Sequence, residues 1–305
     1  MDALIFPLST LAIIVCLGAL LHLQFGQAGI VNFGVVGFSG LGMYLTAILV
    51  IEAEQPFGLA LVIATVVTGL VAAALGWLIL DLDNEAVLVA TLAFATIVWH
   101  LSTTEDQLTG GVVGLGTVPL PFDLGDYRAT TLAYLGVLVA IAAALVLYAR
   151  QVSRVPYGRL IRSIQDNEPL ARSLGKPTFR HKVVFFAVTC ALMGTIGGLD
   201  AAVQQFLVPR LLLADTTFVV WIALILGGRT RVLGAFFGAL LTVGLFDIVV
   251  EQYVEVPREY SLLLPDLQLM AFGMVLMLVI LFRPAGLLGD GRKRRAPGAA
   301  KGASA

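Results

Sequence analysis

"FGLALVIATVVTGLVAAALGWLIL", residues 57–80, runs for 24 positions without a charged side chain. A helix needs about 20 predominantly apolar residues to cross the hydrocarbon core of a bilayer, so this run is long enough to span a membrane. The whole chain agrees, because 59% of its 305 residues are hydrophobic and 13% are charged, whereas a soluble domain is roughly half apolar and about a quarter charged. The sequence therefore predicts an integral membrane protein.

Apolar runs of this kind recur along the chain. They cover about 4–23, 33–51, 57–80, 86–102, 131–149, 183–206, 216–228, 232–250 and 263–282. The runs are continuous, whereas the strands of an outer-membrane barrel alternate apolar and polar residues. We therefore expect an all-α fold, a polytopic transmembrane helical bundle of about 8–10 membrane segments. Residues 1–290 would form a single transmembrane domain.

The segment "QFGQAGIVNFGVVGFSGLGMYL", residues 24–45, is too rich in glycine for a plain span. We expect a broken or re-entrant segment there, of the kind that lines a cavity in transporters. The amide of Asn32 lies inside an apolar run and needs a partner, which is either cargo or, more commonly, a neighbouring helix. Glycines let helices approach closely or leave backbone carbonyls open to a path. The predicted translocation path comprises Gly26, Gly29, Asn32, Phe33 and Gly34.

The basic residues are unevenly distributed. Eight of the 19 Lys and Arg residues lie within 150–182, and no basic residue precedes Arg128. Six more follow residue 282, and the positive-inside rule places both regions in the cytoplasm. The C-terminus is then cytoplasmic, with 291–305 a basic, disordered tail, while 81–85 lies inside and 103–130 outside.

The block 150–182 contains no spanning run and predicts short helices on the cytoplasmic face. Ile161, Ile164, Leu170 and Leu174 are spaced so that apolar and charged sides separate, as on a helix that docks against something. A helix, a break near Asn167, a second helix "EPLARSL" and a stop at "GKP" (175–177) follow from the capping and proline signals. The same composition is equally typical of an ordinary basic loop.

Several motifs of the chain resemble one known family. The stretch "GRLIRSIQDNEPLARSLGKPTFRHKVVFFAV", residues 158–188, is similar to the cytoplasmic coupling loop of ABC importer permeases, most closely the LivM-type branched-chain amino acid permease family. Pro169 and Leu170 depart from that pattern. Four further segments resemble the family in order along the chain: "LHLQFGQAGIVNFGVVGFSGLGMY" (21–44), "LTGGVVGL" (108–115), "ILGGRTRVLGAFFGALL" (225–241) and "LFRPAGLLG" (281–289). His22, Val35, Arg231 and Ala235 differ from the family's common residues.

The resemblance implies a transport subunit that inserts a short helix into a separate ATPase. The residues that would couple to the ATPase are Arg159, Arg162, Asp166, Glu168, Ala171, Arg172, Leu174 and Gly175. Implied partners are a second permease subunit, two ATPase subunits and an extracytoplasmic solute-binding protein, in the plasma (inner) membrane of a prokaryote. The cargo would be branched-chain or other apolar amino acids moved by alternating access, with urea, short amides or sugars as alternatives carried by related permeases.

The loop 103–130 is longer than a typical connection. It lies on the face expected for the binding protein, and its candidate docking residues are Thr109, Gly110, Gly111 and Gly114. A solvated linker is an equally good interpretation of this loop.

The sequence lacks the chemistry of ATP hydrolysis. A phosphate loop needs Gly-Lys-Ser or Gly-Lys-Thr, but the Gly-Lys pair at Gly175 is followed by Pro177. The chain is therefore expected to bind no cofactor, with ATP and Mg²⁺ used by partner subunits. Isolated His residues and two distant Cys residues predict no metal site, and we expect membrane lipid around the chain and no nucleic-acid partner. A proton-coupled carrier using Asp200 or Asp247 is the alternative from another class.

Overall fold

The computed structural model describes residues 4–228 and 232–244, together with residues 270, 273, 274, 277, 278 and 281. In this part of the chain the elements are helical apart from one isolated β-bridge, so the predicted all-α, polytopic fold is confirmed. The predicted segment 263–282 lies mostly outside the described residues. Asp247, Arg229, Arg231 and the tail 291–305 lie outside them entirely.

Five helices are long and apolar enough to cross a membrane. They are α1 (Ile5–Leu21) with its π-helical continuation η2 (His22–Gln27), α3 (Phe57–Ile79), α4 (Asn84–Thr104), α6 (Tyr127–Val152) and α9 (Thr178–Gln204). Shorter apolar helices are α2 (Val35–Ile51), α10 (Ala214–Gly227) and α11 (Val232–Ala239), which continues into η4 (Leu240–Gly244). Short helices α5 (Asp106–Thr109), α7 (Pro156–Asp166), α8 (Glu168–Ser173) and η3 (Pro209–Leu212) complete the described elements.

Helices α1 and α9 form the interior of the bundle, and α3, α4 and α6 lie at its periphery. Most residues of α1 and α9 are buried, whereas the peripheral helices expose most of theirs. On α3 the exposed side chains are large and apolar, including Leu70, Trp77 and Leu78. A bilayer is the solvent that accommodates such a surface, because its hydrocarbon core offers no penalty to an exposed apolar side chain.

Close packing of α2 on α9 depends on glycine. A Cβ atom added to Gly197 would overlap the backbone of Ser39, and one added to Gly42 would overlap the backbone of Gly194. Small residues at helix contacts let backbones approach, which is how membrane helices gain van der Waals contact where lipid removes the hydrophobic driving force. These glycines of the sequence are therefore explained by packing.

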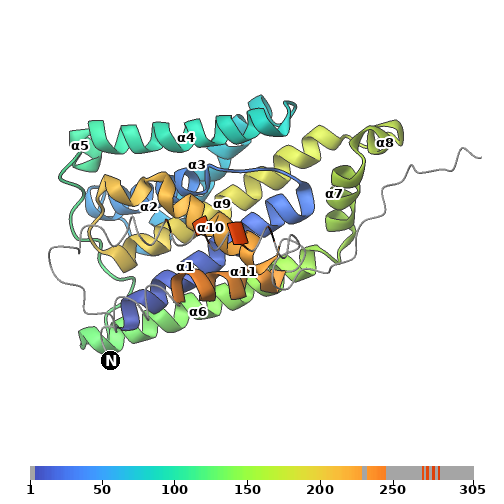
Figure 1. Cartoon of the computed structure of the whole chain (residues 1–305). Coiled ribbons are helices and arrows are strands. Elements are labelled where there is room, and N and C mark those ends of the chain that lie inside the picture. Colours follow the sequence, from blue (N-terminus) through green and yellow to red (C-terminus); the bar gives the residue numbers. More distant parts are fainter. Residues whose placement is uncertain are drawn as a thin grey trace, which may run out of the picture.

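The two ends of the bundle carry different structures. Helices α7 and α8 lie at one end, and α5 and the start of α1 lie at the other (Figure 1). The turn between α3 and α4 lies at the α7–α8 end, because Asp81 forms an ion pair with Arg172. The prediction that 81–85 and 150–182 share one side is therefore confirmed. The loop that contains α5 lies at the opposite end, as expected for 103–130.

Candidate functional site

Helices α7 and α8 form the predicted helix, break and helix within the charged block. Pro156 occupies the first turn of α7, and Asn167 ends α7 and caps α8, its Oδ1 accepting a hydrogen bond of 3.1 Å from the Leu170 backbone N–H. On α7, Ile161 and Ile164 are buried, and burial of such a side chain stabilises the fold by roughly 1.5–3 kcal/mol. Helix α7 is thus fixed to the bundle by its apolar face.

Two large apolar side chains are uncovered at α8, one on the helix and one directly after it. Leu170 is 56% exposed and Leu174 is 71% exposed. Gly175 follows with a φ of 74°, a left-handed conformation that glycine adopts without strain and that commonly ends a helix. The predicted stop at "GKP" is confirmed, and the two leucines remain on the surface of this end of the protein.

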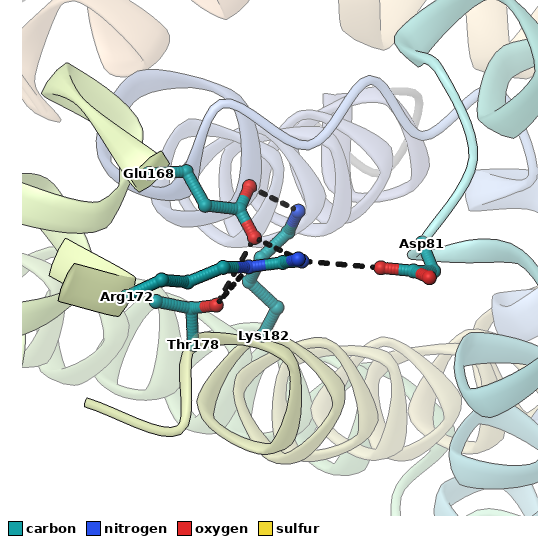
Figure 2. A network of polar contacts seen from close by, with 5 residues as sticks. All are labelled: Asp81, Glu168, Arg172, Thr178 and Lys182. Atoms are coloured by element: carbon teal, nitrogen blue, oxygen red, sulfur yellow. Dashed lines mark hydrogen bonds and ion pairs between the residues drawn. The ribbon is translucent and has the colours of Figure 1, made fainter. Parts of the chain in front are cut away.

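A network of five polar side chains ties α8 to the bundle (Figure 2). The Arg172 guanidinium lies 3.1 Å from the Asp81 carboxylate and 3.0 Å from that of Glu168. Lys182 Nζ lies 3.0 Å from the second Glu168 oxygen, and the Thr178 hydroxyl donates to Glu168 at 3.1 Å. The network therefore connects α8 with the α3–α4 turn and with the first residues of α9.

The charge state of Glu168 follows from this network. Partial burial acts to raise the pKa of the carboxyl, but the hydrogen bond and charge of Lys182, with hydrogen bonds from Thr178 and Arg172, outweigh it. The pKa of Glu168 consequently lies below its usual range. The pKa of Arg172 is raised further by Asp81 and Glu168, so both partners are ionised at neutral pH.

The structure separates the eight predicted coupling residues into two groups. Glu168, Ala171 and Arg172 contact the bundle: Glu168 and Arg172 are in the network, although the Arg172 side chain is 54% exposed, and Ala171 is buried. The others are exposed at the α7–α8 end, namely Arg159, Arg162, Asp166, Leu174 and Gly175. The contacts of the first group attach α8 to the bundle, whereas the second group is accessible to a partner.

The predicted break in the glycine-rich segment is present between η2 and α2. Residues 29–34 are not helical, so their backbone groups need partners from elsewhere. Thr91 of α4 accepts a hydrogen bond of 3.0 Å from the Phe33 N–H, and Thr217 of α10 accepts one of 3.1 Å from the Val36 N–H. Side chains of neighbouring helices thus replace the missing helical bonds.

Asn32 lies at the centre of a buried, uncharged network. Its side chain is fully buried, its Nδ2 donates to Gln24 Oε1 at 2.9 Å, and its Oδ1 accepts from the Gly34 N–H at 2.7 Å. Gln24 Nε2 in turn donates to the Thr189 hydroxyl at 2.7 Å. The Asn32 carbonyl accepts from Trp221 Nε1 at 3.0 Å. These bonds favour satisfaction by neighbouring helices over direct contact between the Asn32 amide and cargo.

Aromatic rings line the break beside this network. Phe33 stacks on Trp221 with ring centroids 4.7 Å apart, and Phe25 meets the same indole edge-on at 4.9 Å. Phe33 also contacts Phe218 at 6.0 Å. Phe33 and Phe25 are half-buried and Phe218 is 40% exposed, so the cluster extends from the buried network to the protein surface.

The other predicted path glycines differ in their surroundings. Gly29 has a φ of 70°, and a Cβ atom there would lie 2.9 Å from Gln165 Cγ of α7. A Cβ atom on Gly34 would lie 2.7 Å from the Thr91 carbonyl oxygen. Gly26 is half-buried. The break is therefore packed against α4 on one side and against the charged block on the other.

The loop at the opposite end is packed rather than free. Leu115 and Leu207 exchange backbone hydrogen bonds of 2.8 and 3.2 Å, and Val118 N–H donates to Gln205 at 2.7 Å. The Thr109 hydroxyl donates to the Ser102 carbonyl at 2.9 Å, and Gly110, Gly111 and Gly114 all adopt positive φ. These contacts favour a defined surface over a solvated linker.

Comparison with known proteins identifies the class of protein. Residues 4–280 match the family described as the permease component of the branched-chain amino acid transport system. The chain belongs to this permease family. It is a transport subunit of an ABC system and not itself an ATPase.

Relatives of this permease come from bacteria and an archaeon. The high-affinity branched-chain amino acid transport system permease protein LivM of Escherichia coli K12 is 29% identical over 330 residues, covering 98% of this chain and 73% of the relative. LivM of Salmonella typhimurium is 29% identical over 305 residues, covering 90% and 68%. A probable LivM of Methanocaldococcus jannaschii is 24% identical over 311 residues, covering 88% of each. No solved structure matches the chain significantly.

Asp200 and the two cysteines are further candidate polar groups within the described helices. Asp200, near the end of α9, accepts a hydrogen bond of 3.2 Å from Gln204. Cys16 and Cys190 are free and buried. Among the residues that the structure describes, no three His, Cys, Asp or Glu side chains gather in a metal-binding group. Membership of the ABC permease family leaves the proton-coupled carrier without support.

Sequence reasoning missed several members of both networks. Gln24 carried the same signal as Asn32, a polar amide within an apolar run, and was not singled out. Asp81 was placed on the same side as the block 150–182, but neither Asp81 nor Lys182 was paired with Arg172 or Glu168. Thr91, Thr217 and Trp221 gave no local signal, because their role depends on the fold bringing α4 and α10 to the break.

Proposed function

We propose that this permease is the membrane-spanning path of an ABC importer for branched-chain or other apolar amino acids. The cargo is inferred from the relatives that are named for branched-chain amino acid transport. The structural observation that carries the proposal is the helix pair α7–α8, which is fastened to one end of the bundle and presents Leu170 and Leu174 outward. An exposed apolar pair at the end of a membrane bundle suits insertion into a groove of another protein.

The proposed complex contains this chain, a second permease subunit, two ATPase subunits and an extracytoplasmic binding protein. ATP and Mg²⁺ are used by the ATPase subunits. The chain lies in the plasma (inner) membrane with the α7–α8 end and the C-terminus in the cytoplasm, which agrees with the concentration of basic residues in 150–182. Residues 1–290 act as one transmembrane domain and 291–305 as a basic tail.

The ATPase docks on the exposed group of the charged block. Leu170 and Leu174 supply the apolar contact, and Arg159, Arg162 and Asp166 supply charges beside it. Glu168, Ala171 and Arg172 hold α8 in place and act through it, as positioning residues. When ATP closes the two ATPase subunits, α7 and α8 move with them and the pathway alternates between its two openings.

Cargo passes beside the break that follows the first span. Phe33 and Phe218 give an apolar surface there. Gly26, Gly29 and Gly34 carry no side chain, so neighbouring groups can come close to the backbone at these positions. Asn32 fixes the shape of the break from behind. At the other end, the surface containing Thr109, Gly110, Gly111 and Gly114 receives the binding protein.

The test is co-purification and ATP-dependent uptake with the natural partner subunits. The double substitution Leu170→Glu and Leu174→Glu places two carboxylates on the proposed docking surface, and we expect ATPase recovery to fall at least about tenfold, a loss of roughly 1.4 kcal/mol or more. Leu124→Glu is the matched control, because Leu124 is 59% exposed in the loop at the opposite end. Equal ATPase recovery from both variants would contradict the docking assignment.

Cargo is then defined by competition in the reconstituted complex. Uptake of radiolabelled leucine that requires ATP and is displaced by isoleucine and valine is the expected result. Displacement by urea or ribose in place of isoleucine would assign the cargo to the related classes. Uptake driven by a proton gradient without ATPase subunits would support the carrier alternative and make Asp200 the residue to substitute.

A further inference from the structure

The end of the first span rests on the charged block. The Gln165 side chain of α7 lies against Gly29, where an added Cβ atom would come within 2.9 Å of Gln165 Cγ. Gln165 Nε2 also approaches the Phe25 carbonyl at 3.5 Å. The backbone of η2 and the break is therefore in direct contact with α7.

A second contact joins the same two regions. The Gln27 side chain donates hydrogen bonds to the Ser153 hydroxyl and to the Ala149 carbonyl at 3.4 Å. Ala149 lies in the last turn of α6, and Ser153 follows that helix directly and precedes α7. The first span is thus held both by α7 and by the segment that leads into it.

The break transmits these contacts to the aromatic cluster over a few residues. Gly29 precedes Asn32 by three positions and Phe33 by four. Asn32 is bonded to Trp221 and Phe33 is stacked on it. The segment between them is held by hydrogen bonds, because the Ile30 N–H donates to the Gln24 carbonyl at 3.0 Å and the Phe33 N–H donates to the Thr91 hydroxyl at 3.0 Å. Movement at Gly29 therefore shifts Phe33 against its neighbours.

We propose that Gly29, Gln27 and Gln165 are positioning residues that carry the displacement of α7 into the break and so couple ATP hydrolysis to cargo movement. This inference rests on the proposed function and adds to it the part of the membrane domain that receives the motion. The ion-pair network of α8 provides the separate attachment to the α3–α4 turn and α9. The contact between Gln165 of α7 and Gly29 links the charged block to the break itself.

The experiment measures ATP hydrolysed and leucine transported by the full complex in proteoliposomes. Gln165→Ala removes the side chain that touches Gly29 and leaves Leu170 and Leu174 unchanged. We expect ATPase activity within about twofold of the wild type, with uptake reduced roughly 2- to 30-fold, the range of coupling effects seen for residues between two sites. A residue needed only for folding would lower ATPase recovery, hydrolysis and uptake together.

Gly29→Ala supplies the matching change on the other side of the contact. Its control is Gly125→Ala, because Gly125 also has a positive φ, of 82°, but an added Cβ atom there has no neighbour within 4 Å. We expect Gly29→Ala to raise the ATP used per leucine and Gly125→Ala to leave it unchanged. The double variant Gly29→Ala with Gln165→Ala should lose less than the product of the single effects, because the added methyl group fills space that Gln165 vacates.

Each outcome decides the proposal. An unchanged ratio of ATP to leucine in Gln165→Ala and Gly29→Ala, or multiplicative effects in the double variant, would overturn it while leaving the importer function intact. A wild-type complex that shows no ATP-dependent uptake of any tested cargo would overturn the proposed function, and this inference with it.

Discussion

The permease contains two polar networks of different physical character. The network around Asn32 is buried, uncharged and formed between spanning segments, whereas the network around Glu168 is charged and partly exposed at one end of the bundle. Removing the partner of a buried amide lowers the free energy of unfolding by about 1–3 kcal/mol, whereas an exposed ion pair contributes about 0–1 kcal/mol to it. The first network therefore stabilises the fold. The second sets the orientation of α8 through weaker contacts, so α8 can still move.

Asn32→Leu should have the largest effect. The substitution leaves Gln24 Oε1 and the Gly34 N–H without their partners in a buried setting, at about 1–3 kcal/mol for each group. We expect a lower thermal midpoint of the detergent-solubilised protein and a loss of uptake. Asn167→Ala is the control, because it removes an exposed asparagine that caps α8 at a cost of about 1 kcal/mol. Equal shifts in the two midpoints would contradict the comparison.

Trp221→Phe should have an intermediate effect. It removes the Nε1–H that donates to the Asn32 carbonyl and retains a ring to stack on Phe33. The lost hydrogen bond is expected to destabilise the protein by about 1 kcal/mol, as measured by the thermal midpoint. The Asn32 backbone carbonyl lies outside any helix and therefore has no helical hydrogen bond to replace the lost one. A thermal midpoint identical to that of the wild type would show that another group donates to this carbonyl.

The contrast between the networks also explains what was predictable from the sequence. Helix positions, the break after η2 and the helix pair α7–α8 follow from hydropathy, glycine content and capping residues, which are local signals. The distant partners in the Asn32 network were not predictable. Trp221 is 189 positions from Asn32 and Thr189 is 165 positions from Gln24, and only packing brings each pair together. The same holds for Asp81, whose pairing with Arg172 depends on the α3–α4 turn reaching α8.

The exposed group of the charged block shows the limit of motif reasoning. The family pattern included Ala171 and Leu174 in one coupling surface, yet Ala171 is buried and Leu174 is exposed. Leu170 departs from the pattern and nonetheless lies on the outer face. A motif records which residues recur along a helix, whereas the side each residue takes is set by how that helix packs on the bundle.

Glu168→Gln should have a small effect on stability. The substitution removes the charge that faces Lys182 and Arg172 and keeps a side chain of similar size. We expect destabilisation of about 1 kcal/mol or less, because surface ion pairs are screened by solvent. The effect should shrink further in high salt, whereas the effect of Asn32→Leu should not change. Salt-insensitive destabilisation by Glu168→Gln would show that the charge of Glu168 is not what stabilises α8.

The pH dependence of stability that arises from Glu168 is the smallest effect, and its direction is clearly defined. Folding lowers the pKa of Glu168 from its ordinary 4.5, so the ionised carboxylate favours the folded state. Its contribution is fully present above about pH 4.5 and is lost as the pH falls through the depressed folded pKa. The wild type should therefore lose more thermal stability than Glu168→Gln when the pH is lowered from neutral to below 4.5. An equal loss of thermal stability in both proteins would show that the acid-sensitive group is not Glu168. It would also show that the charge of Glu168 does not stabilise the folded state.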